Sequence, residues 1–178
     1  MLSIHQLIPQ GRGLARVLLQ RATTIELDWD VRQKSRFAAT DSQGRALAVF
    51  LPRGQAVRGG DVLVAEDGSL VRVIAAPQKV LHITAGTGPG AAFDLMRAAY
   101  HLGNRHVPIE LQPGQLKIEP DHVLADMLRS MRLRVTAADM PFEPEGGAYG
   151  GHVTHDGHGH HAPAGHGHVH GPNCGHAH

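Results

Sequence analysis

The chain has 178 residues, enough for one ordinary domain or two small ones. Hydrophobic residues make up 42% of it and aromatic residues only 4%, so any core must be largely aliphatic. Seventeen Lys and Arg against sixteen Asp and Glu leave a formal charge of +1, which argues against a nucleic-acid-binding protein. Because protonation of all fifteen histidines would raise this charge from +1 to +16, the electrostatics must depend strongly on pH.

Cysteine usage and hydropathy indicate the compartment. Cys174 is the only cysteine, so no intrachain disulfide can form and a secreted disulfide scaffold is excluded. Arg12 and Arg16 interrupt the first twenty residues, which therefore predict no signal peptide. No apolar stretch approaches the roughly 18 residues that a membrane-spanning helix needs. We expect a cytoplasmic protein with no membrane or nucleic-acid partner.

Residues 1–75 have the pattern of a small β-rich domain. Short apolar runs are separated by turn signals, and Asp67-Gly68 between two such runs is typical of a β-hairpin. The predicted strands are 17–19, 24–27, 46–51, 61–64 and 70–74. The most charged segment of this part, residues 28–36, predicts either a solvated loop or edge, or a partner-docking surface around Trp29.

From Pro77 the pattern changes to alternating strands and helices, and we predict a second domain over residues 76–143. The expected order is β-α-β-β-α-β, the split βαβ pattern of ferredoxin-like folds, which makes the protein α+β overall. The second strand of that topology lies at a sheet edge, where Pro108 is tolerated although it has no N–H for a ladder. The predicted strands are 79–84, 107–111, 116–118 and 133–136.

Each of the two predicted helices carries an apolar stripe at helical spacing. The first begins with Pro89 at its first position and ends at Gly103, which fits the left-handed residue that terminates many helices. The second begins near residues 120–121. The stripes consist of Ala92, Leu95, Met96, Ala99 and Leu102 in the first helix and of Leu124, Met127, Leu128 and Met131 in the second.

The stretch from Tyr100 to His106 places two histidines five residues apart, where the first helix gives way to the following strand. Strand alternation puts Val107, Ile109 and Leu111 on one face and His106, Pro108 and Glu110 on the other, so His106 is available to an ion or a partner. A lone histidine on a strand is more often structural or solvated than a ligand. An isologous dimer, however, would supply the same residue twice. His101 and His122 are either further ligands of that region or ordinary surface imidazoles.

Residues 144–178 consist mainly of Gly, His, Ala and Pro, which cannot bury enough apolar surface to order a chain, and we predict a disordered tail. Neutral imidazole is a common ligand for nickel, zinc and copper, so this tail predicts metal binding. An expression tag would carry a longer histidine run than His160-His161. The candidate ligands here are His152, His155, His158, His160, His161, His166, His168, His170, Cys174, His176 and His178.

Motifs of catalysis are missing from the sequence. It has no phosphate-binding loop of the Gly-x-x-x-x-Gly-Lys type, no Gly-x-Ser-x-Gly, no His-Glu-x-x-His and no Cys-x-x-Cys. Paired carboxylates at catalytic spacing are also missing. We therefore predict no catalytic residues and no enzyme.

The segment Tyr-His-Leu-Gly-Asn-Arg-His at residues 100–106, followed by Val107-Pro108, resembles the UreE urease accessory family of nickel metallochaperones. Residues 121–128 are similar to that family as well, and the resemblance extends over about residues 1–143, with a variable histidine-rich tail behind them. The resemblance implies a homodimer joined through the second domain and one Ni(II) held by His106 of both protomers. It also implies further ligands from the tail and a first domain like the peptide-binding modules of chaperones.

By the same resemblance, the partners would be the urease GTPase accessory protein and the apo-urease activation complex, and the function would be nickel delivery to apo-urease. Zn(II) or Cu(II) can bind imidazole in place of nickel. Where some members have a histidine two residues before the position of His122, this chain has Pro120. Two other functions remain open: a prolyl isomerase with a histidine-rich tail, and a metal storage protein in which the tail is the functional part.

Overall fold

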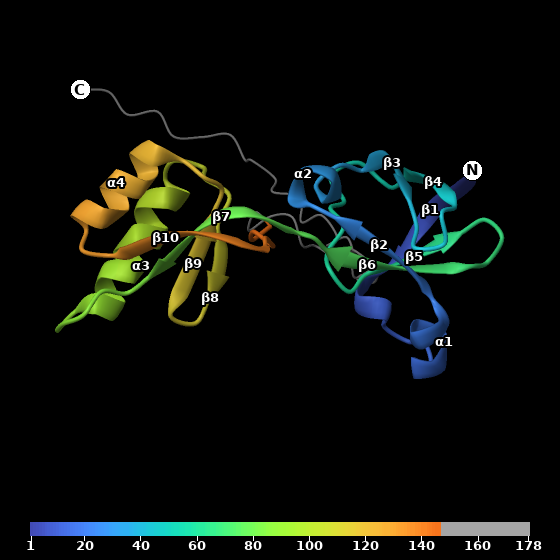
Figure 1. Ribbon diagram of the computed structural model, residues 1–178, viewed down its shortest axis with the longest axis horizontal. Helices are drawn as coiled ribbons and strands as arrows, with labels where there is room; N and C mark the ends of the chain where they lie inside the picture. The colour runs from blue at the N-terminus through green and yellow to red at the C-terminus, as the bar shows by residue number, and fades with distance from the viewer. Residues whose placement is uncertain (147–178) are drawn as a thin grey trace, which may run out of the picture.

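The computed structural model describes residues 1–146, which form two β-sheets (Figure 1). Each sheet has its own hydrophobic core. The first sheet has six strands in the order β2-β6-β5-β1-β4-β3. The strands and short helices of this first domain are β1 (Leu2–Ile8), a 3-10 turn (Pro9–Gly11), α1 (Arg16–Arg21), β2 (Thr23–Leu27), α2 (Trp29–Arg32), β3 (Arg36–Thr40), β4 (Ala46–Phe50), β5 (Val62–Ala65) and β6 (Leu70–Ala75).

The core of the first domain is aliphatic, as the composition requires. Strand β1 lies inside the sheet, parallel to β4 on one side and antiparallel to β5 on the other. Strands β5 and β6 form the antiparallel hairpin expected around Asp67-Gly68. The most deeply buried side chains of this core are Ile4, Leu47, Val49, Val57, Leu63, Val71, Val73 and Ile25.

Two expectations for the first domain were wrong, and two of its strands were missed. Residues 17–19 belong to helix α1 and not to a strand, and no residue of that helix is buried. Strands β1 and β3 were not predicted, because their partly polar sequences become strands only through pairing with β4 and β5. Trp29 is neither solvated nor available to a partner, since it starts helix α2 and is buried.

The second domain has the element order that its sequence predicted. Its sheet runs β10-β7-β9-β8, so β8, the second strand of the unit, lies at the edge, and Pro108 precedes it. The elements are β7 (Pro77–Thr84), α3 (Ala91–Gly103), β8 (Glu110–Gln112), β9 (Gln115–Ile118), α4 (His122–Ser130) and β10 (Arg134–Pro141).

Helix α3 differs from its prediction in its start and in the face that it buries. It begins at Ala91, after Gly90 with φ of 86°, so Pro89 lies outside the helix. Leu95 and Leu102 are buried as expected, but Met96 is exposed. In α4 the expected stripe does pack against the core. At 13 residues α3 is the longest helix, and no helix within residues 1–146 is long and apolar enough to cross a membrane.

The two domains are connected at two places. Only Ala76 separates β6 from β7. The chain then returns to the boundary after β10, in a stretch that we call the interdomain segment (residues 142–146), and Figure 1 shows its start between the two sheets. Phe142 of this segment is fully buried, edge-on to Trp29 of the first domain and in one cluster with Val80 of the second.

Asp41 closes the turn between β3 and β4. Its carboxylate accepts hydrogen bonds from the backbone N–H groups of Gln43 and Arg45 and forms an ion pair of 2.8 Å with the Arg45 guanidinium. Burial, the largest single influence, raises the pKa of Asp41, but these hydrogen bonds together outweigh it and lower the pKa to about 2.

This lowered pKa predicts an acid-dependent loss of stability. The unfolded pKa of Asp is about 3.9, so the contribution of Asp41 to folding is fully present above that pH and is lost as the pH falls towards 2. We expect Asp41→Asn to be less stable than the wild type at pH 7, and the difference to shrink between pH 5 and pH 2. Urea unfolding at stepped pH measures it. A difference that stays constant over this range would contradict the assignment.

Candidate metal centre

His106 lies in the turn between helix α3 and strand β8, with an exposed side chain and a backbone φ of 56°. It was expected on a strand, but the strand begins only at Glu110. The left-handed residue that ends the helix is therefore His106 itself and not Gly103, whose φ is not positive. A positive φ is uncommon for a residue with a Cβ, although it is less rare for His than for most others.

Two backbone hydrogen bonds explain this conformation. The His106 N–H donates to the Gly103 carbonyl at 2.9 Å, and the Val107 N–H donates to the Leu102 carbonyl at 3.2 Å. This pair of bonds is a Schellman motif, which requires a left-handed residue at the position of His106. Val107 and Leu102 belong to the same hydrophobic cluster, as the motif favours. The turn is thus anchored in the core while the imidazole remains in solvent.

Helix α4 ends in the same way. Arg132 has φ of 64°, its N–H donates to the Arg129 carbonyl, and the Leu133 N–H donates to the Leu128 carbonyl. Leu128 and Leu133 are both in the core of the second domain. The repetition indicates that the backbone at His106 is determined by helix termination, independently of any ligand.

His101 lies in the last turn of α3 and is half-buried. Its ring is edge-on to that of Tyr100, with 5.5 Å between centroids, and its carbonyl accepts a hydrogen bond from the Arg105 guanidinium. His122 is the exposed first residue of α4, directly after Asp121, whose carboxylate caps the helix by accepting from the Leu124 N–H. Each is accessible, but from a different part of its helix.

No group of three His, Cys, Asp or Glu side chains that could hold a metal ion occurs within residues 1–146. His101, His106 and His122 therefore do not form a closed site in one described chain. The remaining candidate ligands, from His152 to His178 and including Cys174, lie outside the described residues, as does the predicted disorder of the tail. His82 hydrogen-bonds Gln115 and His5 stacks on Phe50, which accounts for the other two histidines.

Glu110 was expected to lie exposed beside His106, and this was wrong. Its side chain is buried and forms a 2.7 Å ion pair with the buried Lys117 of β9. The other carboxylate oxygen accepts from the Glu143 N–H at 2.7 Å. Leu111, expected in the core, is exposed instead. The faces are exchanged because β8 is short and Glu110 finds its partners across the sheet and in the interdomain segment.

Glu119 is a carboxylate near His122 with a perturbed acidity. Burial raises the pKa of Glu119, three residues before His122, and the neighbouring Asp30 of the first domain raises it further. This repulsion crosses the domain boundary. Glu119 does not form a metal site with His122, since no group of three metal-ligating side chains exists in the described part of the chain.

The sequence matches two family descriptions that together span nearly the whole chain. Residues 4–76 match the UreE urease accessory protein, N-terminal domain, and residues 78–178 match the UreE urease accessory protein, C-terminal domain. The chain belongs to the UreE urease accessory family. The junction between the two matches falls where β6 passes into β7, so the UreE division agrees with the division into two sheets.

Individual UreE proteins are similar over most of their length. The urease accessory protein UreE of Albidiferax ferrireducens is 71% identical over 181 residues and covers 100% of both chains. That of Paracidovorax citrulli is 75% identical over 154 residues, 85% of this chain and 73% of the relative. That of Ralstonia nicotianae is 52% identical over 155 residues, 87% and 72% of the two chains.

The left-handed backbone of His106 gives a prediction that needs no metal. A residue with a Cβ in this conformation costs about 1 kcal/mol, and glycine avoids that cost. In the presence of a chelator, His106→Gly should therefore be about 1 kcal/mol more stable than His106→Ala, which keeps the Cβ and equally lacks the imidazole. Thermal unfolding of both variants measures this difference, and a His106→Gly variant less stable than His106→Ala would contradict it.

Proposed function

We propose that this UreE-family protein is a metallochaperone that binds Ni(II) and delivers it to apo-urease during maturation of the urease active site. The observation that carries the proposal is the exposed imidazole of His106 on a turn whose backbone is fixed by the core. A ligand of this kind can meet an ion without a change in the fold. The family of the chain supplies the urease context.

The openness of the site suits delivery better than storage. A structural metal site encloses its ion with four protein ligands, whereas a site that hands its ion on must keep positions open. His106 offers one exposed imidazole, and the described residues supply no closed set of ligands around it. The ion would be held firmly enough to be withheld from solvent and would remain reachable by an acceptor.

We propose that two protomers complete the site as a homodimer, each contributing His106. The face of α3 that points away from its own core supports this: Phe93, Met96 and Tyr100 are 61%, 65% and 66% exposed and recur at helical spacing. Beside them lies an open apolar groove of about 550 Å³ between α3 and the β8–β9 hairpin, lined in part by Leu111 and Pro113. A second copy that covered this surface would bring its own α3, and hence its own His106, to the twofold axis.

The course of the interdomain segment supports a role for the histidine-rich tail at the same site. The Glu145 N–H donates to the Ile109 carbonyl at 2.8 Å. Glu145 therefore lies beside a residue that is three positions after His106 in sequence. Residues 147–178 contain ten histidines, and their covalent attachment beside the His106 turn would supply imidazole there at high local concentration. We propose the candidate tail histidines and Cys174 as secondary ligands, with His101 and His122 as accessory ones.

The proposal includes the wider setting of the protein. The partners are the urease GTPase accessory protein and the apo-urease complex, the compartment is the cytoplasm, and Zn(II) or Cu(II) can occupy the site in place of Ni(II). We propose domain limits of 1–75, 76–143 and 144–178. The order β10-β7-β9-β8 with two helices supports a ferredoxin-like second domain.

A prolyl isomerase is not favoured, because Trp29, one of the few aromatic side chains, is buried by Phe142.

Nickel titration calorimetry tests the shared site. A chain truncated after Gly147 should bind one Ni(II) per dimer, and His106→Ala in that chain should abolish this binding, since no other described group replaces the imidazole. Its mass in solution should be that of a dimer. His82→Ala, which removes an imidazole bonded to Gln115, is the matched control and should still bind. Absence of nickel binding without the tail would leave a tail-only metal buffer and contradict the role of His106.

Acidification should release the metal. An imidazole must be neutral to bind, so affinity should fall below about pH 6 by up to tenfold per pH unit for each histidine ligand. Nickel competition with a colorimetric chelator between pH 7.5 and pH 5 measures this profile. A flat profile from pH 7 to pH 5 would exclude histidine ligation.

A further inference from the structure

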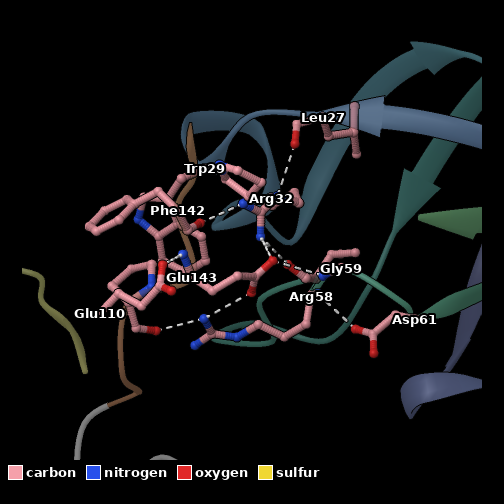
Figure 2. A network of polar contacts seen from close by, with 12 residues as sticks. Leu27, Trp29, Arg32, Arg58, Gly59, Asp61, Glu110, Phe142 and Glu143 are labelled. Carbon is pink, nitrogen blue, oxygen red and sulfur yellow. Dashed lines mark hydrogen bonds and ion pairs between the residues drawn. The ribbon is translucent and has the colours of Figure 1, made fainter. Parts of the chain in front are cut away.

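The interdomain segment contacts both domains at once, through different groups of the same residues. The Glu143 carboxylate and the carbonyls of Phe142 and Pro144 accept hydrogen bonds from the first domain, and the N–H groups of Glu143 and Glu145 donate to the second. Arg32 of the first domain donates to the Glu143 carboxylate and to the Phe142 carbonyl, each at 2.6 Å (Figure 2). The Gly59 N–H donates to the same carboxylate oxygen at 2.9 Å. Arg58 donates to the Pro144 carbonyl at 2.6 Å and pairs with Glu143 at 3.4 Å.

On the other side, the segment holds the residues that follow His106. The Glu143 N–H donates to the Glu110 carboxylate at 2.7 Å, and the Glu145 N–H donates to the Ile109 carbonyl at 2.8 Å. We call residues 106–110 the His106 segment. Within residues 1–146, its other backbone hydrogen bonds outside the sheet are the two Schellman bonds at His106 and Val107. The His106 segment therefore makes four polar contacts with described residues outside its own sheet. Two of them come from Glu143 and Glu145.

We propose that Glu143 is a positioning residue for the metal site, through which the first domain sets the conformation of the His106 segment. This inference rests on the proposed role of His106 as a nickel ligand. Glu143 does not touch the ion. Its carboxylate is fixed by Arg32 and Gly59, and its N–H in turn fixes Glu110, four residues from the ligand.

The charges and burial of the residues involved explain why the coupling should be strong. Arg32 is fully buried, and a buried cation that loses its anion leaves an uncompensated charge. The Arg58 guanidinium lies over the Trp29 ring, 4.9 Å from its centroid. This contact holds in place the surface of the first domain on which the interdomain segment packs. Glu110 is buried with Lys117, which also donates to the Pro141 carbonyl at 2.6 Å. A shift of Glu143 must therefore be transmitted to both sides.

The same contacts hold the last described residues of the chain beside the His106 segment. The Glu145 N–H bonds to the Ile109 carbonyl, and so residues 143–146 lie along this segment. Release of Glu143 would therefore disturb the His106 turn and residues 143–146 together. Outer groups that orient metal ligands typically change metal affinity by 10- to 100-fold when removed.

The test uses the full chain with Glu143→Gln, which removes the carboxylate charge with little change in shape. Glu145→Gln is the matched control, since that side chain is exposed and only its backbone N–H is used. Arg32→Lys, a change in the first domain alone, is the second variant, because lysine cannot reproduce the forked donation of arginine. Circular dichroism of each variant checks that the fold is retained.

Two measurements are made on each variant. Hydrogen–deuterium exchange without metal follows residues 107–112 and 142–146, and nickel titration follows the site. We expect faster exchange in both regions and about tenfold weaker nickel binding for Glu143→Gln and Arg32→Lys, and no change for Glu145→Gln.

Exchange at residues 107–112 that is equal in wild type and Glu143→Gln would overturn the proposal, whatever the metal result. Faster exchange with unchanged nickel affinity would also overturn it, because the segment would then be held without positioning the ligand. If the His106→Ala variant binds nickel as tightly as the wild type, the proposed function fails. The exchange data then show separately whether the first domain holds this segment.

Discussion

The buried guanidinium of Arg32 imposes the strictest constraint on this structure. A cation removed from water must have its donors and its charge satisfied, and Arg32 meets this with the Leu27 carbonyl, the Phe142 carbonyl and the Glu143 carboxylate. Burial lowers the pKa of Arg32, whereas the charge of Glu143 acts in the opposite direction. Two of these three acceptors lie more than a hundred positions away in sequence. The first domain is therefore complete only when the end of the second domain is in place.

From this constraint follows the relation between the domains. A single residue, Ala76, joins β6 to β7, and such a linker alone would leave relative motion as the default expectation. The return of the chain after Pro141 adds a second connection, with Phe142 packed between Trp29 and Val80 and with Glu143 between Arg32 and Glu110. No buried side-chain nitrogen or oxygen in residues 1–146 lacks a hydrogen-bond partner, so the junction is formed without unsatisfied polar groups. The orientation of the second domain, and with it the His106 turn, depends on contacts made in the first.

The sequence was informative where local patterns determine structure and uninformative where distant partners do. The order of elements in the second domain, the edge position of β8 and the Asp67-Gly68 hairpin followed from periodicity and turn residues. Strand β1 did not, because its identity depends on being placed between β4 and β5. Glu110 was assigned to solvent by alternation and is buried, since its partners, Lys117 and Glu143, cannot be found from the neighbouring residues. The role of Phe142 could have been suspected, because it is a large aromatic residue in a chain with few.

The conformation of His106 combines a helix terminus with the proposed metal ligand. The Schellman bonds and the burial of Val107 beside Leu102 fix the backbone at the cost of a left-handed residue with a Cβ. Glycine would relieve that cost but would remove the proposed ligand, so the histidine at this position is better explained by its side chain than by folding. Arg132, the corresponding residue of α4, has the same backbone and no proposed ligand role, which means that the motif alone does not make a site. What distinguishes His106 is the imidazole together with the exposed face of α3 next to it, on which the proposed second copy of the chain would complete the coordination.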